Sequence, residues 1–579
     1  MTKKNSRLYP FLISALVLLV GILLCLPAVL PIFKGGLFPI HDDTQVVRVF
    51  EMYKSLKGGM FPVRWVEDLG YGFGYPIFNF YAPLAYYVGG FAMIAGLNLI
   101  SATQLMFIFG ALFAFVTMYL FMRSLLGQVP GLVAGIVYMY FPYHAVIIYI
   151  RGAVGEFYAY AFLPLVFWGM IKLFEMFQEK NVKFEKSLKW ILISAIGILL
   201  VAISHNLTLY MLGLTLAAFI GITIVLSKKR KPLIYSYLFS LILGGMLASF
   251  YLVPAVFESS YTNVASQVGG GADYPDHFVC LKQLYESQWG FGGSVSGCVD
   301  GLSFKIGKIN VMLFIVSFAL FVFAKFRKHK NHHNLIETIS YVLLGLSIFL
   351  LLPISKFLWD VIPGMEFLQY PWRFLNFVGL FLSIIVGFFV YRLKQYSKFA
   401  PIIASVIIIA ATLFFNVKLF KPQSFRDKTV SEYIYQPDIR FRVSKISDEY
   451  MPKGFIKPKT ENEISMQTIE IVGKVKINSF DRNTTNIKSM VTIESPSQVK
   501  YLLAYFPTWN FYVNGQKIKP SIQNTGVFIS LQPGTYSLEA RYQQTLIEKI
   551  ANLISLIGIL IVFVVIIGLV KQIYGKKTS

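Results

Sequence analysis

Long apolar runs separated by short basic clusters recur along this 579-residue chain, and they constrain its fold more than any motif does. Hydrophobic residues make up 56% of the sequence and charged residues only 14%, which is typical of proteins with many transmembrane helices. Because a helix satisfies its own backbone hydrogen bonds in lipid, we predict a mostly α-helical membrane protein. The runs lie at 8–33, 82–99, 103–122, 130–150, 157–171, 190–204, 207–226, 233–254, 309–324, 335–353, 374–391, 400–416 and 549–570.

The basic clusters decide which of these runs cross the membrane. If every run crossed, with residues 3–7 inside, the lysines at 180–189 and the cluster at 228–231 would lie outside, against the positive-inside rule. The conflict disappears if the run at 82–99, which contains Pro83 and several glycines, lies along the outer interface. We therefore expect about twelve transmembrane helices, with outer loops at 34–102 and 255–308.

The formal net charge of +24 lies mainly in the basic clusters between the apolar runs. The charge therefore indicates topology in a membrane, and we expect no nucleic-acid partner. The first run is long and lacks an Ala-x-Ala-like cleavage site, so we expect it to remain as a signal anchor. The prediction is a multi-pass protein of the cell membrane with both termini in the cytoplasm.

Residues 417–548 are less apolar and show period-two alternation, for example at 469–472 and 498–502. Such alternation predicts β-strands, and Asn514-Gly515 is a strong hairpin-turn dipeptide. We expect three parts: a transmembrane domain at 1–416, an external antiparallel β-sandwich at 417–548, and a final transmembrane helix with a cytoplasmic tail at 549–579.

Two of the three cysteines, Cys280 and Cys298, share the predicted outer loop at 255–308. An oxidising outer compartment favours a disulfide between them, with unpaired structural cysteines as the alternative. Cys25, in the first apolar run, is expected to be a small buried residue.

Asp42 and Asp43 follow the first apolar run directly, at the predicted outer mouth of a transmembrane helix. Carboxylates there are costly to desolvate and usually face a water-filled cavity, a substrate or a metal. Asp42 is the candidate general base that takes a proton from an acceptor hydroxyl or amine, with Asp43 assisting. The alternative is that the acids cap a helix starting near Thr44, although a cap needs only one side chain.

Glu156 lies at the outer end of the run at 130–150, so the topology brings it to the face that carries Asp42. It is a second candidate catalytic carboxylate that orients the acceptor or a metal. Oxygen ligands suit Mg²⁺ or Mn²⁺, so a divalent cation bridging Asp42 or Asp43 with Glu156 is a candidate cofactor, although no dedicated metal motif is present. The alternative is an Arg151–Glu156 ion pair that closes a loop.

Arginine and aromatic residues at the outer mouths of the helices are candidates for substrate binding. Arg373 offers a bidentate phosphate contact and Trp372 a stacking surface, with interfacial anchoring as the alternative. His205 lies at an outer turn, where a structural role is more common. The full candidate set is His41, Arg64, Trp65, Arg151, His205, Trp372 and Arg373.

Two aromatic segments have competing interpretations. The loop at 62–81 is rich in glycine and aromatic residues but lacks the strand-to-helix setting of a nucleotide-binding loop. It suits an acceptor or sugar surface, or it packs the outer loop. Residues 505–509 present either a sugar platform or part of the sandwich core.

The order of these motifs resembles a known membrane family. His41-Asp42, residues 59–65, Gly70-Tyr71-Gly72 and Phe80-Tyr81-Ala82-Pro83-Leu84 resemble the 6-pyruvoyl-tetrahydropterin-synthase-related family, as do 151–164, 283–307 and 370–373. That family, with the YfhO-like proteins, resembles the GT-C superfamily of polytopic glycosyltransferases. The resemblance covers nearly the whole chain. Val46 and Val47 stand where some relatives carry a second histidine after the aspartate.

The resemblance implies an inverting glycosyltransferase with Asp42 as the loop carboxylate. Its donor would be a polyprenyl-phosphate-linked sugar. Its partners would be the membrane lipid and a saccharide, lipid or protein acceptor. We expect Arg64 and Arg373 to bind the donor phosphate. One alternative is a transporter or flippase of lipid-linked saccharides, which predicts functional polar residues deep in several helices. Another is a non-catalytic scaffold that binds envelope polymer through the sandwich.

Overall fold

The computed structural model describes residues 5–34, 36–179, 184–264, 273–326 and 333–575. Within this part of the chain, ten helices are long and apolar enough to cross a membrane, or eleven if one bent pair is counted as a span. They confirm the predicted multi-spanning helical class. The ten are α1 (Asn5–Phe33), α5 (Leu99–Leu126), α8 (Val154–Met176), α10 (Asn206–Leu226), α11 (Arg230–Phe257), α13 (Lys308–Phe326), α14 (Asn334–Leu351), α16 (Leu375–Leu393), α17 (Ala400–Asn416) and α21 (Leu546–Gly575).

The number of spans is smaller than the predicted value of about twelve. The bent pair joins α6 (Gln128–Met139) to residues 142–150, which comprise α7 (Pro142–Ala145) and η1 (Val146–Ile150), at an angle of 48°. The predicted run at 190–204 forms α9 (Leu188–Ala202), whose 15 residues are fewer than a full span needs. Several of the basic residues used to assign the topology, at 3–4, 180–183, 327–330 and 576–577, lie outside the described residues.

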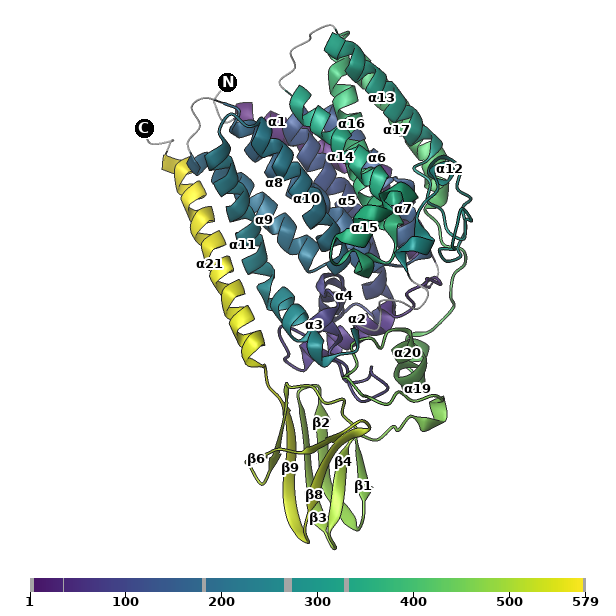
Figure 1. Ribbon diagram of the computed structural model, residues 1–579, viewed down its shortest axis with the longest axis vertical. Helices are drawn as coiled ribbons and strands as arrows, with labels where there is room; N and C mark the ends of the chain where they lie inside the picture. Colours follow the sequence, from purple (N-terminus) through teal and green to yellow (C-terminus); the bar gives the residue numbers. More distant parts are fainter. Residues whose placement is uncertain (1–4, 35, 180–183, 265–272, 327–332, 576–579) are drawn as a thin grey trace.

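The predicted interfacial run at 82–99 forms a short helix. This helix, α4 (Leu84–Ile94), has 11 residues and is therefore too short to cross a bilayer at about 1.5 Å per residue. It lies with α2 (Gln45–Lys57) and α3 (Ile77–Phe80) between the helix bundle and the β-sandwich, at the end of the bundle away from both chain termini (Figure 1). Its place along a membrane interface stays a prediction.

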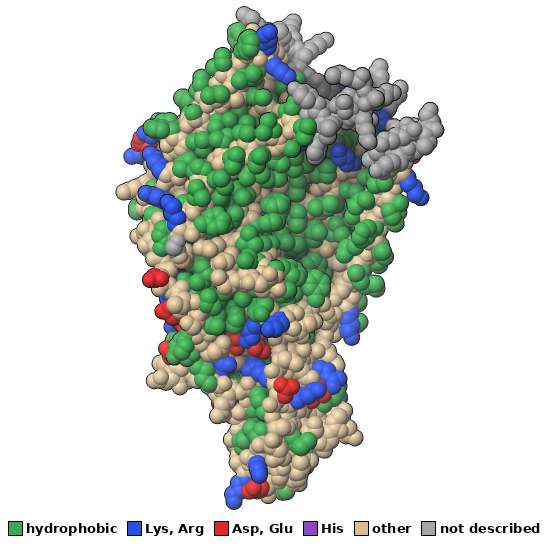
Figure 2. Space-filling model, turned by 180° about the vertical axis from the view of Figure 1, so that it is seen from behind, with side chains coloured by type: hydrophobic (Ala, Val, Ile, Leu, Met, Phe, Trp, Pro, Cys, Tyr) green, Lys and Arg blue, Asp and Glu red, His purple; other side chains and the backbone are tan. Residues whose placement is uncertain are grey.

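The outer surface of the bundle is strongly apolar. Hydrophobic side chains cover much of the helix bundle in Figure 2, whereas charged side chains lie around its margins and toward the β-sandwich. Among the ten candidate spans, the last helix, α21, is the most exposed. Only 11% of its most apolar segment is buried, and the side chains of Leu560 and Val564 are 63% and 69% exposed. Such a surface needs lipid around it, since soluble proteins rarely expose large contiguous apolar patches.

The β-sandwich consists of two antiparallel sheets formed by residues 469–542. One sheet has the order β1-β4-β8-β7 and the other the order β2-β3-β9-β5-β6. As the sequence predicts, Asn514 and Gly515 form the β5–β6 turn, with φ angles of 46° and 79°. The strands are β1 (Ile469–Val472), β2 (Val475–Asn483), β3 (Asn486–Ile493), β4 (Ser497–Tyr501), β5 (Trp509–Val513), β6 (Gln516–Ile518), β7 (Ser521–Gln523), β8 (Gly526–Leu531) and β9 (Gly534–Tyr542).

The sandwich is shorter than the predicted range of 417–548, because residues 417–468 contain no strand and form what we call the connector. The connector consists of short helical turns and extended stretches, without the period-two alternation that marks the later strands. One turn begins with a capping box, in which Thr429 and Glu432 satisfy each other's backbone N–H groups. Its helical elements are η9 (Val417–Leu419), α18 (Val430–Tyr433), α19 (Gln436–Asp438), η10 (Ile439–Val443), α20 (Ser444–Ile446) and η11 (Glu461–Glu463).

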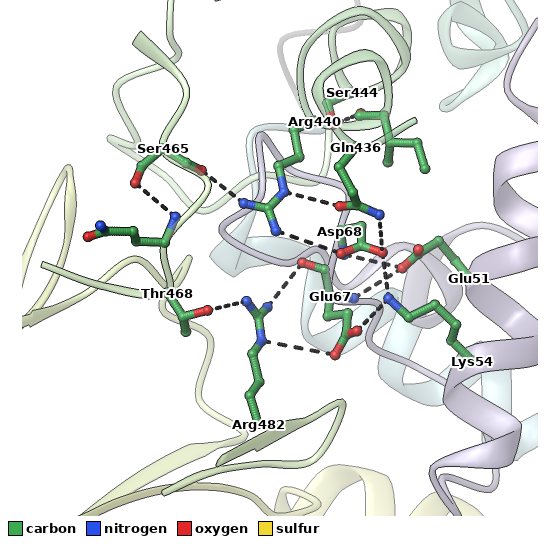
Figure 3. A network of polar contacts seen from close by, with 12 residues as sticks. Glu51, Lys54, Glu67, Asp68, Gln436, Arg440, Ser444, Ser465, Thr468 and Arg482 are labelled. Atoms are coloured by element: carbon green, nitrogen blue, oxygen red, sulfur yellow. Dashed lines mark hydrogen bonds and ion pairs between the residues drawn. The ribbon is translucent and has the colours of Figure 1, made fainter. Parts of the chain in front are cut away.

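A partly buried polar network fixes the connector to the loop at 34–102 (Figure 3). Lys54 on α2 pairs with Glu67 and Asp68, and Gln436 of the connector donates to Asp68 at 3.2 Å. Arg482 on β2 donates to the backbone oxygen of Glu67 at 3.3 Å, so that the sandwich joins the same network. The loop, connector and sandwich are therefore held in one relative arrangement.

Candidate active site

A cavity of about 320 Å³ lies where the loop at 34–102, the helix ends and the connector meet. We call it the polar cavity. Its walls come from segments that are far apart in the sequence, and they carry most of the charged side chains that the sequence analysis singles out. The ionisable and polar residues that line it are Asp42, Tyr81, Arg151, Glu156, Ser204, His205, Asn206, Gln369, Arg373, Glu449 and Tyr450.

Backbone hydrogen bonds place Asp42 at the cavity. The N–H of His41 donates to the oxygen of Ile150 at 3.1 Å, and the N–H of Asp42 donates to that of Arg151 at 3.2 Å. The chain turns away at Gly152, where φ is +59° and a Cβ would lie 2.4 Å from Ile40 Cδ1. This ladder brings the first loop directly beside Arg151.

The carboxylate of Asp42 makes no hydrogen bond or salt bridge with any described residue, although it faces the cavity. The capping alternative does not hold, because α2 begins after Thr44 without any side-chain cap. Asp42 therefore keeps its oxygen lone pairs available to a molecule in the cavity.

Asp43 points to a different environment. Its carboxylate accepts hydrogen bonds from Arg426 at 2.6 and 2.7 Å and from Arg442 at 3.4 Å, and it lies outside the polar cavity. Both arginines belong to the connector. The neighbouring aspartates thus differ: one ties the first loop to the connector, and the other faces the cavity.

Arg151, Glu156 and Arg373 form a buried charge cluster in the cavity wall. Glu156 is fully buried and accepts hydrogen bonds from Tyr143 at 2.5 Å, Arg151 at 2.5 Å and Asn376 at 3.0 Å. Arg373 Nε lies 3.9 Å from Glu156. Two cations share one carboxylate, so this part of the wall carries a net positive charge and offers guanidinium donors to an anion, while Asp42 and Glu449 line other parts of the same cavity.

The charged form of Arg151 is stabilised by its partner. Burial by itself lowers the pKa of Arg151, but the carboxylate of Glu156 outweighs that effect and the pKa is raised. The ion pair between these two residues, which was the alternative to a catalytic role for Glu156, is present, and both residues also line the cavity.

His205 caps helix α10 and also lines the cavity. Its Nδ1 accepts a hydrogen bond from the backbone N–H of Thr208 at 3.2 Å. Burial lowers the pKa of His205 to about 3, so the ring is neutral near pH 7 and carries its proton on Nε2. The helix α8 approaches closely here: a Cβ on Gly155 would lie 2.6 Å from the oxygen of Ser204.

Glu449 is a cavity residue that the sequence reasoning missed. It comes from the connector, and Ser447 donates to its carboxylate at 3.0 Å while Arg48 donates to Ser447 at 2.8 Å. Burial raises the pKa of Glu449. No motif surrounds this residue, and a tertiary contact from a segment predicted to be sandwich leaves no local sequence signal.

Several other predicted site residues lie outside the polar cavity. His41 contacts the backbone oxygen of Phe291 at 3.0 Å. Trp65 packs edge-on against Trp509 of the sandwich, with ring centroids 5.6 Å apart. Trp372 stacks under Arg151, whose guanidinium carbon is 4.7 Å from the ring centroid, so it supports a cavity residue from behind.

Arg64 also lies away from the cavity, in a buried structural position. It donates to Asn79 at 2.9 Å, to the backbone oxygen of Phe250 at 2.7 Å and to Asn552 at 3.0 Å. These partners tie the first loop to α11 and α21. Arg64 is therefore placed to join three segments rather than to meet a phosphate in the cavity.

The structure joins Cys280 and Cys298 in the loop at 255–308 by a disulfide, with Cα atoms 5.6 Å apart, and leaves Cys25 free and buried. The predicted cation bridge between Asp42 or Asp43 and Glu156 does not fit the side chains. Glu156 already accepts from three donors and Asp43 is paired with arginines. No group of three His, Cys, Asp or Glu in the described part of the chain is arranged to hold a metal.

Comparison with known proteins agrees with the predicted membrane family over part of the chain. Residues 78–269 match the 6-pyruvoyl-tetrahydropterin synthase related domain, a membrane-protein family. The matched segment contains Arg151, Glu156 and His205, whereas Asp42, Arg373 and Glu449 lie outside it. No curated protein matches the sequence.

Among solved structures, the chain is similar to the archaeal oligosaccharyltransferase AglB from Archaeoglobus fulgidus, in complex with an inhibitory peptide and a dolichol-phosphate. The identity is 12%, the TM-score is 0.46, and the similarity covers 79% of this chain and 62% of that one. ArnT from Cupriavidus metallidurans, bound to undecaprenyl phosphate, has 11% identity and a TM-score of 0.39, covering 69% and 64%. The arabinofuranosyltransferase AftD from Mycobacteria has 10% identity and a TM-score of 0.41, covering 73% and 30%. A substantial part of each neighbouring chain therefore has no counterpart here.

Proposed function

We propose that this protein is a membrane glycosyltransferase of the GT-C type that transfers a sugar from a polyprenyl-phosphate-linked donor to an acceptor, with inversion. One observation carries the proposal: the carboxylate of Asp42, which accepts no side-chain hydrogen bond from the described residues, shares a cavity with Arg151 and Arg373. Such a carboxylate is available to take the acceptor proton, and the arginines are available to stabilise a phosphate leaving group.

The reaction can be written with these residues. Asp42 takes the proton of the acceptor hydroxyl as its oxygen attacks the anomeric carbon of the donor sugar. The bond between that carbon and the phosphate oxygen breaks, and the electron pair leaves with the polyprenyl phosphate. Arg151 and Arg373 stabilise the phosphate as its charge grows, because preorganised cations near developing charge lower the barrier.

The helix bundle also has an apolar groove of about 260 Å³ between α13, α14 and α16, which Val378 and Leu382 of α16 line. It offers a surface on which the isoprenoid chain of a lipid-linked donor packs.

The remaining cavity residues receive supporting roles. Neutral His205 donates its Nε2–H to a sugar hydroxyl, and Glu449 accepts from another. Glu156 holds Arg151 in place and is a positioning residue. We further propose that the cavity and the sandwich face the outside of the cell and both termini face the cytoplasm, in agreement with the basic clusters between the helices.

Sugar transfer in proteoliposomes tests the proposal. The full chain is reconstituted with radiolabelled polyprenyl-phosphate hexoses or pentoses and an extract of envelope acceptors, and wild type is compared with Asp42→Asn. Loss of a positioned general base is expected to slow transfer about 10²–10⁴-fold. Asp427→Asn is the matched control, since Asp427 is an exposed aspartate of the connector.

The result that overturns the assignment of the base is equal transfer by wild type and Asp42→Asn. The absence of transfer and of donor hydrolysis by wild type, with every donor in the panel, would overturn the activity itself. Loss of activity in Asp427→Asn as well would show that any change in this region disturbs folding.

A further inference from the structure

A second cavity, of about 390 Å³, lies where the end of α11, the connector and the β-sandwich meet. We call it the junction groove. Tyr261, Lys453, Phe455, Tyr505, Gln523 and Asn524 are among its lining residues. From the sequence alone, residues 505–509 form either a sugar platform or part of the sandwich core. The structure divides them: Phe506 and Trp509 are buried, whereas Tyr505 borders the groove.

The junction groove adjoins the polar cavity. Val264 and Tyr450 line the cavity, whereas Tyr261 and Pro452, only a few residues away in each segment, line the groove. The two segments are paired by backbone hydrogen bonds, from Asn263 N to Met451 O and from Lys453 N to Tyr261 O, each 3.1 Å long. A single pair of extended segments therefore forms a wall of both sites.

The distance between the two sites is short. Two extended residues span about 7 Å, so the groove begins about that far from the cavity along the connector. Phe80 of the cavity stacks on Tyr450, with centroids 5.3 Å apart, and packs edge-on against Phe506 at 6.0 Å. The sandwich is thus held against the cavity, and an extended molecule can occupy both sites.

The lining of the groove combines ring faces with unused hydrogen-bonding groups. Tyr261 is 46% exposed, and Tyr505 and Phe455 supply further aromatic surface. The side chains of Lys453, Gln523 and Asn524 make no hydrogen bond with any described residue. A sugar ring has an apolar C–H face that packs on an aromatic ring and a rim of hydroxyls that pair with amide groups.

The turn that carries the amide groups is fixed in place. Gln523 ends β7, Asn524 follows in the turn before β8, and the N–H of Ile456 donates to the oxygen of Asn524 at 3.1 Å. The connector therefore holds the turn by its backbone and leaves its side chains for a ligand. Such preorganisation reduces the entropy lost on binding.

We propose that the junction groove binds the saccharide portion of the acceptor, so that the polar cavity transfers its sugar onto a glycan. This inference rests on the proposed glycosyltransferase function, because the groove acquires its role from the cavity beside it. Tyr261 and Tyr505 stack on acceptor sugar rings, and Gln523 and Asn524 pair with their hydroxyls.

Saccharide binding by the full-length protein in detergent tests the groove without requiring catalysis. Short hexose and N-acetylhexosamine oligomers are titrated by calorimetry into wild type, Tyr261→Ala, Tyr505→Ala and the double variant Gln523→Ala/Asn524→Ala. Tyr435→Ala is the matched control, because Tyr435 is an exposed tyrosine of the connector outside the groove. We expect at least one oligomer to bind, and each single tyrosine change to weaken binding about tenfold.

A second readout separates the groove from the transfer chemistry. Hydrolysis of the polyprenyl-phosphate sugar, with water as acceptor, is expected to persist in the groove variants while transfer to a glycan falls about tenfold. Asp42→Asn is expected to show the opposite pattern: it keeps its affinity for the saccharide but loses both sugar transfer and donor hydrolysis. Thermal melting of each variant identifies any that fail to fold.

The inference is overturned if no oligomer binds wild type, if the groove variants and Tyr435→Ala bind equally well, or if an acceptor peptide without sugar occupies the groove instead. Saccharide binding without any transfer or hydrolysis would contradict the proposed enzyme and leave a saccharide site. Transfer that is unaffected by the groove variants would contradict the groove and leave the enzyme.

Discussion

Replacing Glu156 by glutamine removes the carboxylate that faces both Arg151 and Arg373 in the wall of the polar cavity. Glu156 is fully buried, its partner Arg151 is mostly buried, and Arg373 Nε lies 3.9 Å from the same carboxylate. In Glu156→Gln the two guanidinium groups stay in place without an anion. Removal of one partner from a buried pair costs about 3–5 kcal/mol, chiefly because the other charge remains buried and unpaired.

The lower end of that range applies here. Glutamine keeps one oxygen that can accept from Tyr143 and Asn376, so only the interaction with the arginines is lost. We therefore expect a loss of about 3 kcal/mol, which at roughly 2 °C per kcal/mol for a large domain lowers the melting temperature by about 6 °C. Sugar transfer falls as well, because Arg151 loses the group that orients it.

The assay is the amount of monodisperse protein that remains after heating in detergent, measured by size-exclusion chromatography. Glu494→Gln on the sandwich surface is the control, since Glu494 is exposed. The double variant Arg151→Met/Glu156→Gln should lose less stability than the sum of the two single changes, because each single change breaks the same pair. A melting temperature of Glu156→Gln equal to that of wild type would refute the argument that Glu156 compensates a buried charge.

Two further predictions concern residues at the edge of the site. The pKa of His205 is about 3 in the folded protein, below the usual value near 6.5, so the unfolded chain binds more protons between these two pH values. The stability of the protein therefore falls as the pH drops below about 6.5. His205→Asn keeps a capping oxygen and should flatten this pH dependence in melting curves recorded from pH 7 to pH 5. Arg64 donates hydrogen bonds to Asn79, Phe250 and Asn552, so we expect Arg64→Ala to lower the free energy of unfolding by about 3 kcal/mol. The protein that stays folded should keep its affinity for polyprenyl phosphate in a filter-binding assay. A selective loss of that affinity would instead place Arg64 in the donor site.

Hydropathy and charge predict the helical class well, because both depend on the composition of each segment. The runs that form α5, α10 and α16 are apolar enough to be recognised without knowledge of their neighbours. The count of spans is less secure, since it depends on length: α9, with 15 residues, is apolar but shorter than a span. The connector escapes prediction because helical turns of three to five residues have no detectable period.

The roles of charged residues depend on partners that the sequence does not place. From the sequence alone, Arg64 and Asp43 are both candidate site residues, since both lie in the predicted first outer loop. Their partners come from hundreds of residues away: Asn552 on α21 for Arg64, and Arg426 and Arg442 in the connector for Asp43. Spacing within the loop carries no information about those contacts, so sequence patterns draw attention to the loop but not to the cavity that part of it lines.

What separates a candidate catalytic carboxylate from a structural one in this molecule is the number of donors that the fold supplies to it. Asp43 receives two arginines and Glu156 receives an arginine, a tyrosine hydroxyl and an asparagine amide, so their charges are already compensated. Asp42 lies beside Arg151 in the backbone ladder and receives no donor from any described residue. A fold that supplies donors to its neighbours and none to Asp42 leaves that carboxylate available to water or to a donor that enters the cavity, which is what the proposed acceptor hydroxyl requires of a base.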